Sequence, residues 1–438
     1  MSTLPGAWRR LLNRFWFVPA VCLAAAVVLA QAAVAVDRAL PDDLSSPWVA
    51  WVYAVGIDGS RAMLSAIGGS MLGVAATAFS ITISVIATAS STYGPRLVRN
   101  FMADRGNQTV LGVLVATFVY ALLVLRTIRS ASDDLAEPFV PHLAVNLAVV
   151  LAVADVALVV WFIHHIADSV QVDTLVHGAR RRLLDVVERW HPERLPEDRA
   201  RTGGHRGGGG EVSADAVGYV LDVDLARICS VLEDAGARAE LLPRVGDHRL
   251  RDEPLFRVWP EERAEDLAGP LRRAVRLGDA RSADQDVRFA EQQVVELAVR
   301  ALSPGTNDPY TAINAVEEVA AGIVTAVSRP LPGNTVVADG VPRLRHATVE
   351  LEEIVDMPFD QIRPHVGGHA EVVLALIDLA ARIEAATVHE HLRTRVREHV
   401  GTLLAQFAAG GPSDRDLVRV RARADLRRLG DAAVPPPE

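Results

Sequence analysis

The sequence predicts a mainly α-helical membrane protein, with a four-helix transmembrane domain followed by a cytoplasmic α/β subdomain and a helical C-terminal region. Three observations predict this fold class. Long uncharged runs are concentrated in the first 170 or so residues, whereas charged residues dominate the remainder. Short apolar runs separated by turn residues follow residue 211. Helical periodicity then returns after Asp284 and continues almost to the C-terminus.

Composition excludes several functions. The net charge of −9 argues against a nucleic-acid-binding protein. The sequence contains no lysine, so a phosphate-loop lysine, a Schiff-base lysine and a kinase ATP-binding lysine are absent. The two cysteines, Cys22 and Cys229, indicate neither a disulfide framework nor a cysteine metal site.

The transmembrane domain is expected over residues 1–170, with spans at about 15–36, 63–90, 107–126 and 142–166. Each contains roughly the 20 predominantly apolar residues that a bilayer crossing requires. A cleaved signal peptide is the alternative for the first span, because Ala33-Val34-Ala35 resembles a cleavage site. Its apolar run exceeds the roughly 7–15 residues of a signal peptide, so an uncleaved anchor is favoured.

The distribution of arginine predicts the topology in the membrane. The N-terminal arm, the loop after the second span and the segment after the fourth span are rich in arginine: Arg9, Arg10, Arg14; Arg96, Arg99, Arg105; Arg180, Arg181, Arg182. The intervening loops carry more acidic residues: Asp37, Asp42, Asp43, Asp58; Asp133, Asp134, Glu137. Because arginine-rich loops remain in the cytoplasm, we expect a plasma-membrane protein with both termini cytoplasmic.

The second span carries small and hydroxylated residues at intervals of three and four. We call this set the small-residue stripe: Ser70, Gly73, Thr77, Ser80, Ser84, Ala87 and Ser91. On a helix these residues share one face. Such a face either packs against another helix, because small residues allow close approach, or lines a polar pathway in an oligomer.

Asp155 is the acidic residue well inside a span, and an intramembrane carboxylate suggests ion or proton handling. A protonated carboxyl, or one bonded to a neighbouring helix, is the structural alternative. His164 and His165 close the fourth span. Adjacent helical residues point about 100° apart, so anchoring at the interface or capping is favoured over shared metal binding.

Residues 171–210 are expected to form a helical extension of the fourth span, through about residue 190, and a glycine-rich linker at 202–210. The cytoplasmic soluble domain is expected over residues 211–438. It should begin with a strand at 218–221 and a helix at 224–235. Further elements are a hairpin around Asp339-Gly340 and helices near 370–386, 389–408 and 414–429.

Enzyme signatures are missing from the sequence. It contains no His-Glu-x-x-His, Gly-x-Ser-x-Gly or Cys-x-x-Cys motif. His365 and His369 are separated by two glycines, and His389 and His391 face apart on a helix. We therefore expect no catalytic activity, no cofactor and no metal site.

One polar segment stands out in the soluble domain. It comprises Arg281, Asp284, Gln285 and Asp286, and then Asn307 and Asp308. The structural interpretation is a capped helical hairpin, in which the aspartates begin successive helices and Pro309 takes the first helical position. The functional interpretation is a polar cluster that binds an ion or couples to the membrane part.

The same segment carries a family resemblance. Its motifs are Arg281…Asp284-Gln285-Asp286, Ala301-Leu302-Ser303-Pro304-Gly305-x-Asn307-Asp308-Pro309-x-Thr311-Ala312, Tyr93-Gly94-Pro95-Arg96-Leu97, Asp104-Arg105-Gly106-Asn107-Gln108 and Phe162-Ile163-His164-His165-Ile166. Together they resemble the bacterial membrane proteins grouped as domain of unknown function 2254. The sequence departs from that pattern at Ser282, where threonine is expected, and Asp155 is not part of it. The resemblance implies an oligomer-capable protein with four spans and supplies no activity.

These observations lead to one favoured function and two alternatives. The favoured function is an oligomeric ion or solute channel, or its regulator, gated by the cytoplasmic domain. Its partners would be the lipid bilayer and further copies of the chain. The first alternative is a membrane-anchored sensor or scaffold whose cytoplasmic domain binds a partner without transport. A membrane enzyme is least supported, because no catalytic constellation is present.

Overall fold

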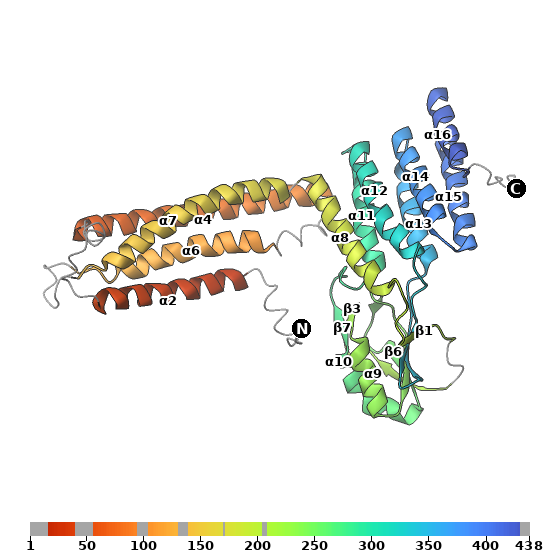
Figure 1. Ribbon diagram of the computed structural model, residues 1–438, viewed down its shortest axis with the longest axis horizontal. Coiled ribbons are helices and arrows are strands. Elements are labelled where there is room, and N and C mark those ends of the chain that lie inside the picture. Colours follow the sequence, from red (N-terminus) through yellow and green to blue (C-terminus); the bar gives the residue numbers. More distant parts are fainter. Residues whose placement is uncertain are drawn as a thin grey trace. The chain divides into compact units, whose positions relative to one another are not determined.

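The computed structural model describes residues 16–39, 56–93, 104–129, 139–169, 171–203 and 208–429. The chain divides into two compact units, Met1–Gln171 and Val172–Glu438 (Figure 1). Several segments used in the sequence analysis lie outside the described residues, namely 9–14, 42–43, 94–99, 133–137 and 204–207.

Among its described residues, the first unit has four helices that are long and apolar enough to cross a membrane. They are α2 (Phe17–Ala39), α4 (Ile57–Tyr93), α6 (Arg105–Leu125) and α7 (His142–Ser169). The predicted membrane-spanning part of the fold is thereby confirmed. Helix α4 extends beyond the predicted span at both ends. Helix α6 begins where expected because the Asp104 side chain accepts a hydrogen bond from the Gly106 amide at 2.6 Å.

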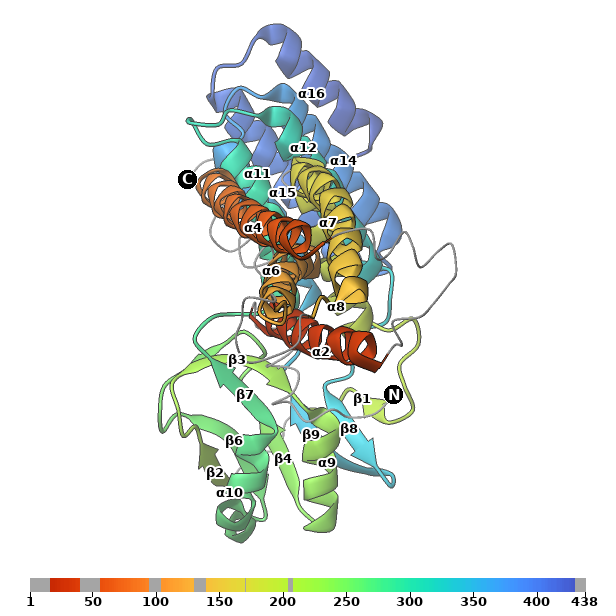
Figure 2. The same ribbon diagram turned by 90° about the vertical axis from the view of Figure 1, so that its left-hand side faces the viewer.

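Helix α6 is the central helix of this unit. Half of the residues in its 18-residue apolar stretch are buried, whereas 22% are buried in the corresponding stretch of each of the other three spans. Figure 2 views the helices nearly end-on, with α6 between α4 and α2. A Cβ atom at Gly112 would lie 3.0 Å from Pro19 Cα, so glycine permits the close approach of α2. The Tyr120 hydroxyl donates to the Ala144 carbonyl of α7 at 2.9 Å.

The second unit begins with α8 (Val172–Trp190) and contains two sheets. The order of the six-stranded sheet is β1 (Arg199–Ala200), β8 (Thr335–Ala338), β9 (Val341–His346), β4 (Arg238–Leu241), β6 (Pro254–Trp259), β2 (Gly210–Ser213). Strands β4 and β9 pair in parallel, and the other neighbours are antiparallel. The three-stranded sheet has the order β5 (His248–Arg249), β3 (Gly218–Val223), β7 (Val275–Gly278).

Helices α9 (Leu225–Asp234) and α10 (Ala264–Arg273) pack on these strands (Figure 1). Their apolar faces and the inward residues of the strands form one core, with Ile228, Leu232 and Phe256 fully buried. Burial of these apolar side chains is the main stabilising contribution to this part of the fold. The predicted α/β subdomain is confirmed.

The remainder of the second unit is helical, as predicted. Its helices are α11 (Val287–Ala301), α12 (Pro309–Val327), α13 (Leu351–Ile362), α14 (Ala370–Ala386), α15 (Glu390–Ala409) and α16 (Asp414–Leu426). Helix α8 belongs to the same assembly, because it packs against both α11 and α12. Helix α12 in turn packs against α14, which contacts α15 and α16.

Local sequence signals mark several element boundaries correctly. Asp224, Asp286 and Asp308 each accept a backbone hydrogen bond from the third residue after them, at the starts of α9, α11 and α12. Asp339 and Gly340 both have positive φ, at 50° and 72°, and connect β8 to β9. This is the backbone conformation that Asp-Gly favours in a two-residue hairpin.

The connection between the units differs from the expected single helix. Helix α7 ends at Ser169, Gln171 is not helical, and α8 starts at Val172. The expected linker also ends earlier, because Gly210 is the first residue of β2. A Cβ atom at Gly209 would lie 2.8 Å from the Trp259 ring, and one at Gly210 would lie 2.5 Å from Ala264 Cβ. These glycines are therefore required by packing.

We predict that Gly322→Ala destabilises the second unit. Gly322 lies where α12 meets α8, and an added Cβ would lie 2.5 Å from the Cγ and Cδ2 atoms of the buried Leu183. Overpacking of this kind costs about 1–3 kcal/mol, so the midpoint of thermal unfolding in detergent should fall. Leu183→Ala in the same chain should restore part of the loss.

The matched control is Gly305→Ala, because nothing lies within 4 Å of a Cβ atom at that position. Its unfolding midpoint should equal that of the wild type. Equal midpoints for Gly322→Ala and Gly305→Ala would contradict the packing described here.

Candidate functional site

Helix α4 has two opposite faces. Its buried face packs against α6 and α7 and comprises Leu64, Gly68, Met71, Ala75, Ala78 and Thr82. The small-residue stripe lies on the other face, since 100° per residue places it roughly opposite. Six of its residues are exposed within the unit: Ser70, Gly73, Thr77, Ser80, Ser84 and Ala87. Ser91 lies in the helix, but its side chain is outside the described residues.

The exposed face continues with small residues toward the start of α4, at Ala62, Ala66 and Gly69. The hydroxyls of Ser70 and Thr77 donate to carbonyls of the preceding turn, each at 3.0 Å. These bonds allow hydroxyls to lie in an apolar medium, while Ser80 and Ser84 retain donors that no described residue accepts. The stripe is thus a narrow, weakly polar surface that packing among the described helices of the unit does not cover.

Asp155 does not join this surface. It lies on α7 with a 1% exposed side chain, and its oxygens make no hydrogen bond of ordinary geometry with the described residues. The buried Thr117 hydroxyl of α6 is the polar group that interacts with it. The structure therefore places Asp155 inside the helix packing and not beside the small-residue stripe.

Two motif segments of the membrane unit meet at one end of α6. Asp104 Oδ2 lies 2.9 Å from His165 Nε2, and the His165 ring stacks on Trp161 with centroids 4.7 Å apart. A Cβ atom at Gly106 would lie 2.8 Å from the same His165 nitrogen. The helix-capping carboxylate thus also binds α7, a long-range contact that sequence spacing alone does not reveal. His164 instead pairs with Asp168 at 3.2 Å.

In the second unit, Gln285 connects three elements. Its amide Nε2 donates to the Asp222 carboxylate, and its Oε1 accepts from the Val223 amide at 3.1 Å, both at the end of β3. Its backbone carbonyl accepts from Trp190 Nε1, at the end of α8, at 2.8 Å. Because α11 begins two residues later, this one residue fixes α8, β3 and α11 relative to one another.

The buried carboxylate of Asp286 both caps a helix and pairs with an arginine. Its Oδ1 caps α11 through the Phe289 amide at 3.0 Å, and its Oδ2 accepts from Arg281 Nε at 2.8 Å. The Arg281 guanidinium also lies 5.1 Å from the centre of the Phe289 ring. Burial raises the pKa of Asp286, and the adjacent Arg281 charge opposes that rise. Asp284, in contrast, is exposed, and its carbonyl accepts from Arg189 Nη1 at 3.1 Å.

Asn307 and Asp308 lie at the other end of α11, so the predicted polar cluster is not a single site. The helix has 15 residues, which corresponds to roughly 22 Å. Asn307 has a φ of +49° and its Oδ1 lies 3.0 Å from His369 Nε2 at the start of α14. Asp308 caps α12. This second group therefore orders a helical turn, whereas the first group joins three elements.

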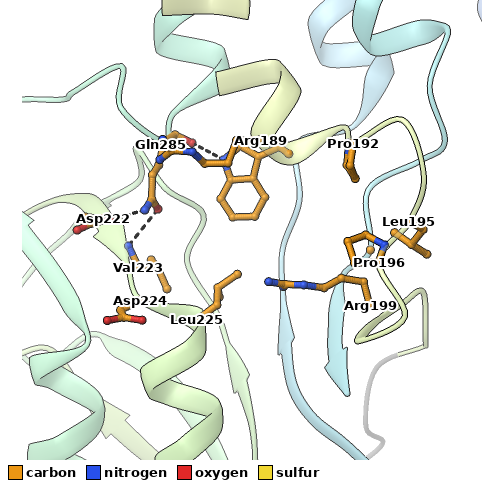
Figure 3. A pocket seen from close by; sticks show the side chains of 12 residues that line it. Arg189, Pro192, Leu195, Pro196, Arg199, Asp222, Val223, Asp224, Leu225 and Gln285 are labelled. Atoms are coloured by element: carbon orange, nitrogen blue, oxygen red, sulfur yellow. Dashed lines mark hydrogen bonds between the residues drawn. The ribbon is translucent and has the colours of Figure 1, made fainter. Parts of the chain in front are cut away.

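A cavity of about 430 Å³ lies beside Gln285 (Figure 3). Its walls come from the end of α8, the following segment, β1, the end of β3 and the start of α9. Apolar side chains share the lining with charged ones: Arg189, Trp190, Leu195, Arg199, Asp224 and Leu225. Figure 3 shows the Arg199 side chain extending across the cavity toward Leu225. Sequence reasoning missed this site, because its residues are distributed over more than 140 positions of the chain, from Arg189 to Gly333.

Glu291 is a second group that the sequence did not single out. It lies on α11, is fully buried, and neither of its oxygens has a hydrogen-bond partner among the described residues. Burial raises its pKa well above the ordinary value, and the nearby Asp356 on α13 raises it further. Asp356 itself accepts hydrogen bonds from Arg395 and His399. Burial without a hydrogen-bond partner therefore disfavours the charged form of the Glu291 carboxyl.

Comparisons with known proteins agree with the membrane architecture. The family described as “Predicted membrane protein (DUF2254)” matches residues 12–382. Uncharacterised proteins of Mycobacterium bovis and Mycobacterium tuberculosis are each 31% identical over 401 residues, covering 86% of this chain and 74% of the relative. No solved structure matches the chain.

We predict that Arg281→Gln strongly destabilises the second unit. The substitution leaves the carboxylate of Asp286, whose side chain is 1% exposed, without its cation. Breaking one side of a buried pair costs about 3–5 kcal/mol. The double variant Arg281→Gln/Asp286→Asn should recover much of this loss, since asparagine is also a helix cap.

Arg300→Gln is the matched control for this pair. Arg300 bonds Glu296 four residues earlier, at the far end of the same helix and with greater exposure. Its loss should cost only about 0.3–0.5 kcal/mol in denaturant unfolding of the detergent-solubilised protein. Similar losses for Arg281→Gln and Arg300→Gln would show that the Asp286 pair is not buried as described.

We predict that Glu291→Gln stabilises the protein increasingly as the pH rises. The folded pKa of Glu291 lies above the unfolded value of about 4.3, so wild-type stability falls as the pH rises from there toward the folded pKa. Within that window the gain should grow by up to about 1.4 kcal/mol per pH unit. Thermal unfolding at pH 5 and pH 8 should therefore show a small and a large gain, respectively.

Glu296→Gln on the same helix provides the control, because Glu296 is partly exposed and paired with Arg300. Its effect should not increase between these two pH values. A gain from Glu291→Gln that is equal at both would mean that Glu291 is not titrating in a buried site.

Proposed function

The chain belongs to the DUF2254 family of predicted membrane proteins, and we propose that copies of it assemble through α4 into a conduit for ions or small polar solutes. The exposed small-residue stripe on α4 is the observation that supports this proposal. The C-terminal unit would control the conduit or, where another protein conducts, regulate that protein. The proposal assigns no catalytic step to either unit.

The composition of the stripe favours a second copy over lipid as its neighbour. Lipid chains supply no hydrophobic driving force between helices, so association depends on close packing and interhelical hydrogen bonds. Small side chains at every turn permit that packing. The hydroxyls of Ser80 and Ser84 provide donors along the same face. A conduit follows if α4 helices of several copies surround a common axis.

Orientation is part of the proposal. The arginine distribution favours cytoplasmic termini in the plasma membrane, which would place the C-terminal unit in the cytoplasm. Helix α8 follows α7 in the chain after only Val170 and Gln171. This short connection makes α8 the element through which a change in the C-terminal unit would reach the membrane helices.

A membrane-anchored sensor without transport is the second candidate. The cavity beside Gln285 favours it, because concave sites of this size commonly bind small molecules. Flux measurements discriminate between the two functions, since a sensor requires no pathway through α4.

We predict that purified protein in liposomes dissipates an imposed gradient of K⁺, Cl⁻ or H⁺. The variant Thr77→Leu/Ser80→Leu/Ser84→Leu should abolish flux while leaving the oligomer intact, because leucine side chains would fill a polar pathway. Flux is measured with ion-sensitive dyes, and assembly by cross-linking and light scattering in detergent.

The control variant is Ala154→Leu/Ala157→Leu, which enlarges exposed small residues on α7. It should preserve both flux and assembly. Loss of assembly in the α4 variant would identify the stripe as a packing face only. Absence of flux in the wild type across voltage and pH would exclude a conduit and leave the sensor.

A further inference from the structure

The cavity beside Gln285 is lined by one cation, Arg199, whose guanidinium has no hydrogen-bond acceptor among the described residues. The other charged groups at its wall have partners: Asp222 accepts from Gln285, Asp224 accepts from the Arg227 amide, and Arg189 donates to the Asp284 carbonyl. The Arg199 guanidinium makes no hydrogen bond to any described residue. Its nearest acid is Asp198, at 3.9 Å.

The Arg199 side chain is placed so that the hydrogen-bond donors of its guanidinium point into the cavity. Its side chain is 26% exposed, whereas the Asp198 side chain is 59% exposed and therefore well solvated. Figure 3 shows the guanidinium directed across the cavity. Its positive charge also contributes to lowering the pKa of the buried His346, after the larger effect of burial. A guanidinium in this setting binds carboxylate or phosphate oxygens well, with paired hydrogen bonds.

Another part of the lining suits a flat ring. The Trp190 indole lines the cavity, and its Nε1 hydrogen bond to the Gln285 carbonyl fixes the orientation of the ring. Leu225 and Leu195 add apolar surface. A volume of about 430 Å³ lies within the range of small-molecule sites, which combine apolar walls with a few placed polar groups.

We propose that this cavity binds a small molecule consisting of a flat aromatic or heterocyclic ring with one anionic group. Arg199 binds the anion, and Trp190 with Leu225 contacts the ring. The ligand contacts α8, β1 and the start of α9 at once, so it connects elements that the chain supplies from three different segments. Binding does not depend on the proposed conduit, because every lining residue belongs to the second unit.

The test uses the full chain in nanodiscs and matched pairs of probes, measured by isothermal titration calorimetry. Adenosine 5′-monophosphate is compared with adenosine, and indole-3-acetate with indole-3-acetamide, so that each pair differs in its anionic group. At least one anionic probe should bind more tightly than its neutral partner. The phosphate and carboxylate pairs then distinguish the two sources of the anion.

Variants locate the binding. Arg199→Gln should weaken the anionic probe by about tenfold or more, as expected for loss of a charge-assisted hydrogen bond, and leave the neutral partner unchanged. Arg194→Gln, an exposed arginine in the same connecting segment and outside the cavity, is the control and should bind as the wild type does. Leu225→Trp should reduce binding of both probes by filling the cavity.

Two results would overturn the proposal. One is the absence of binding by both anionic probes at millimolar concentration. The other is equal affinity in the Arg199→Gln and Arg194→Gln variants. Unchanged unfolding midpoints of the variants without ligand verify that each remains folded. If no probe binds but the protein conducts ions in liposomes, the conduit proposal stands and the binding proposal fails. If a probe binds but no flux is measured, the binding proposal stands and the conduit proposal fails.

Discussion

The arrangement of the second unit depends on the hydrogen bonds of Gln285. An amide side chain can donate and accept at once, and here it does both at the end of β3 while its backbone carbonyl binds Trp190. Glutamate at this position would lack the donor to Asp222 and add a second negative charge. The next residue, Asp286, begins α11. The positions of α8, the sheet and the helical region therefore follow from two consecutive residues.

Burial of polar groups distinguishes the two ends of α11. At its start, Asp286 is buried but satisfied by Arg281 and by the helix backbone. Farther along the helix, Glu291 is buried and has no hydrogen-bond partner among the described residues, so burial disfavours its charged form. The last turn of α11 is followed by an exposed loop, in which Asn307 adopts a positive φ and Asp308 caps α12. The buried carboxyl groups of α11 thus lie in the first half of this helix.

Local signals in the sequence predict the parts of this fold that neighbouring residues determine. The caps at Asp224, Asp286 and Asp308, the Asp339-Gly340 hairpin and the apolar spans all follow from short-range chemistry. Helices α10 and α13 escaped prediction because each contains an internal proline, Pro270 or Pro358. The parallel pairing of β4 with β9 and the contact of Gln285 with Asp222 join residues that are distant in sequence. No periodicity encodes such pairings, so neither the cavity nor the burial of Glu291 could be derived.

Helix α8 is the physical link between the candidate site and the membrane helices. Its first residue follows α7 after two residues, and its last residue, Trp190, lines the cavity and bonds Gln285. A ligand shifts a conformational equilibrium only when it contacts two arrangements differently. Leu183 packs closely against Gly322 in the middle of α8, which leaves little room for small sliding of this helix on α12. A ligand at the proposed Arg199 site would influence α8 only if it bound two packing arrangements of Trp190 with different affinity.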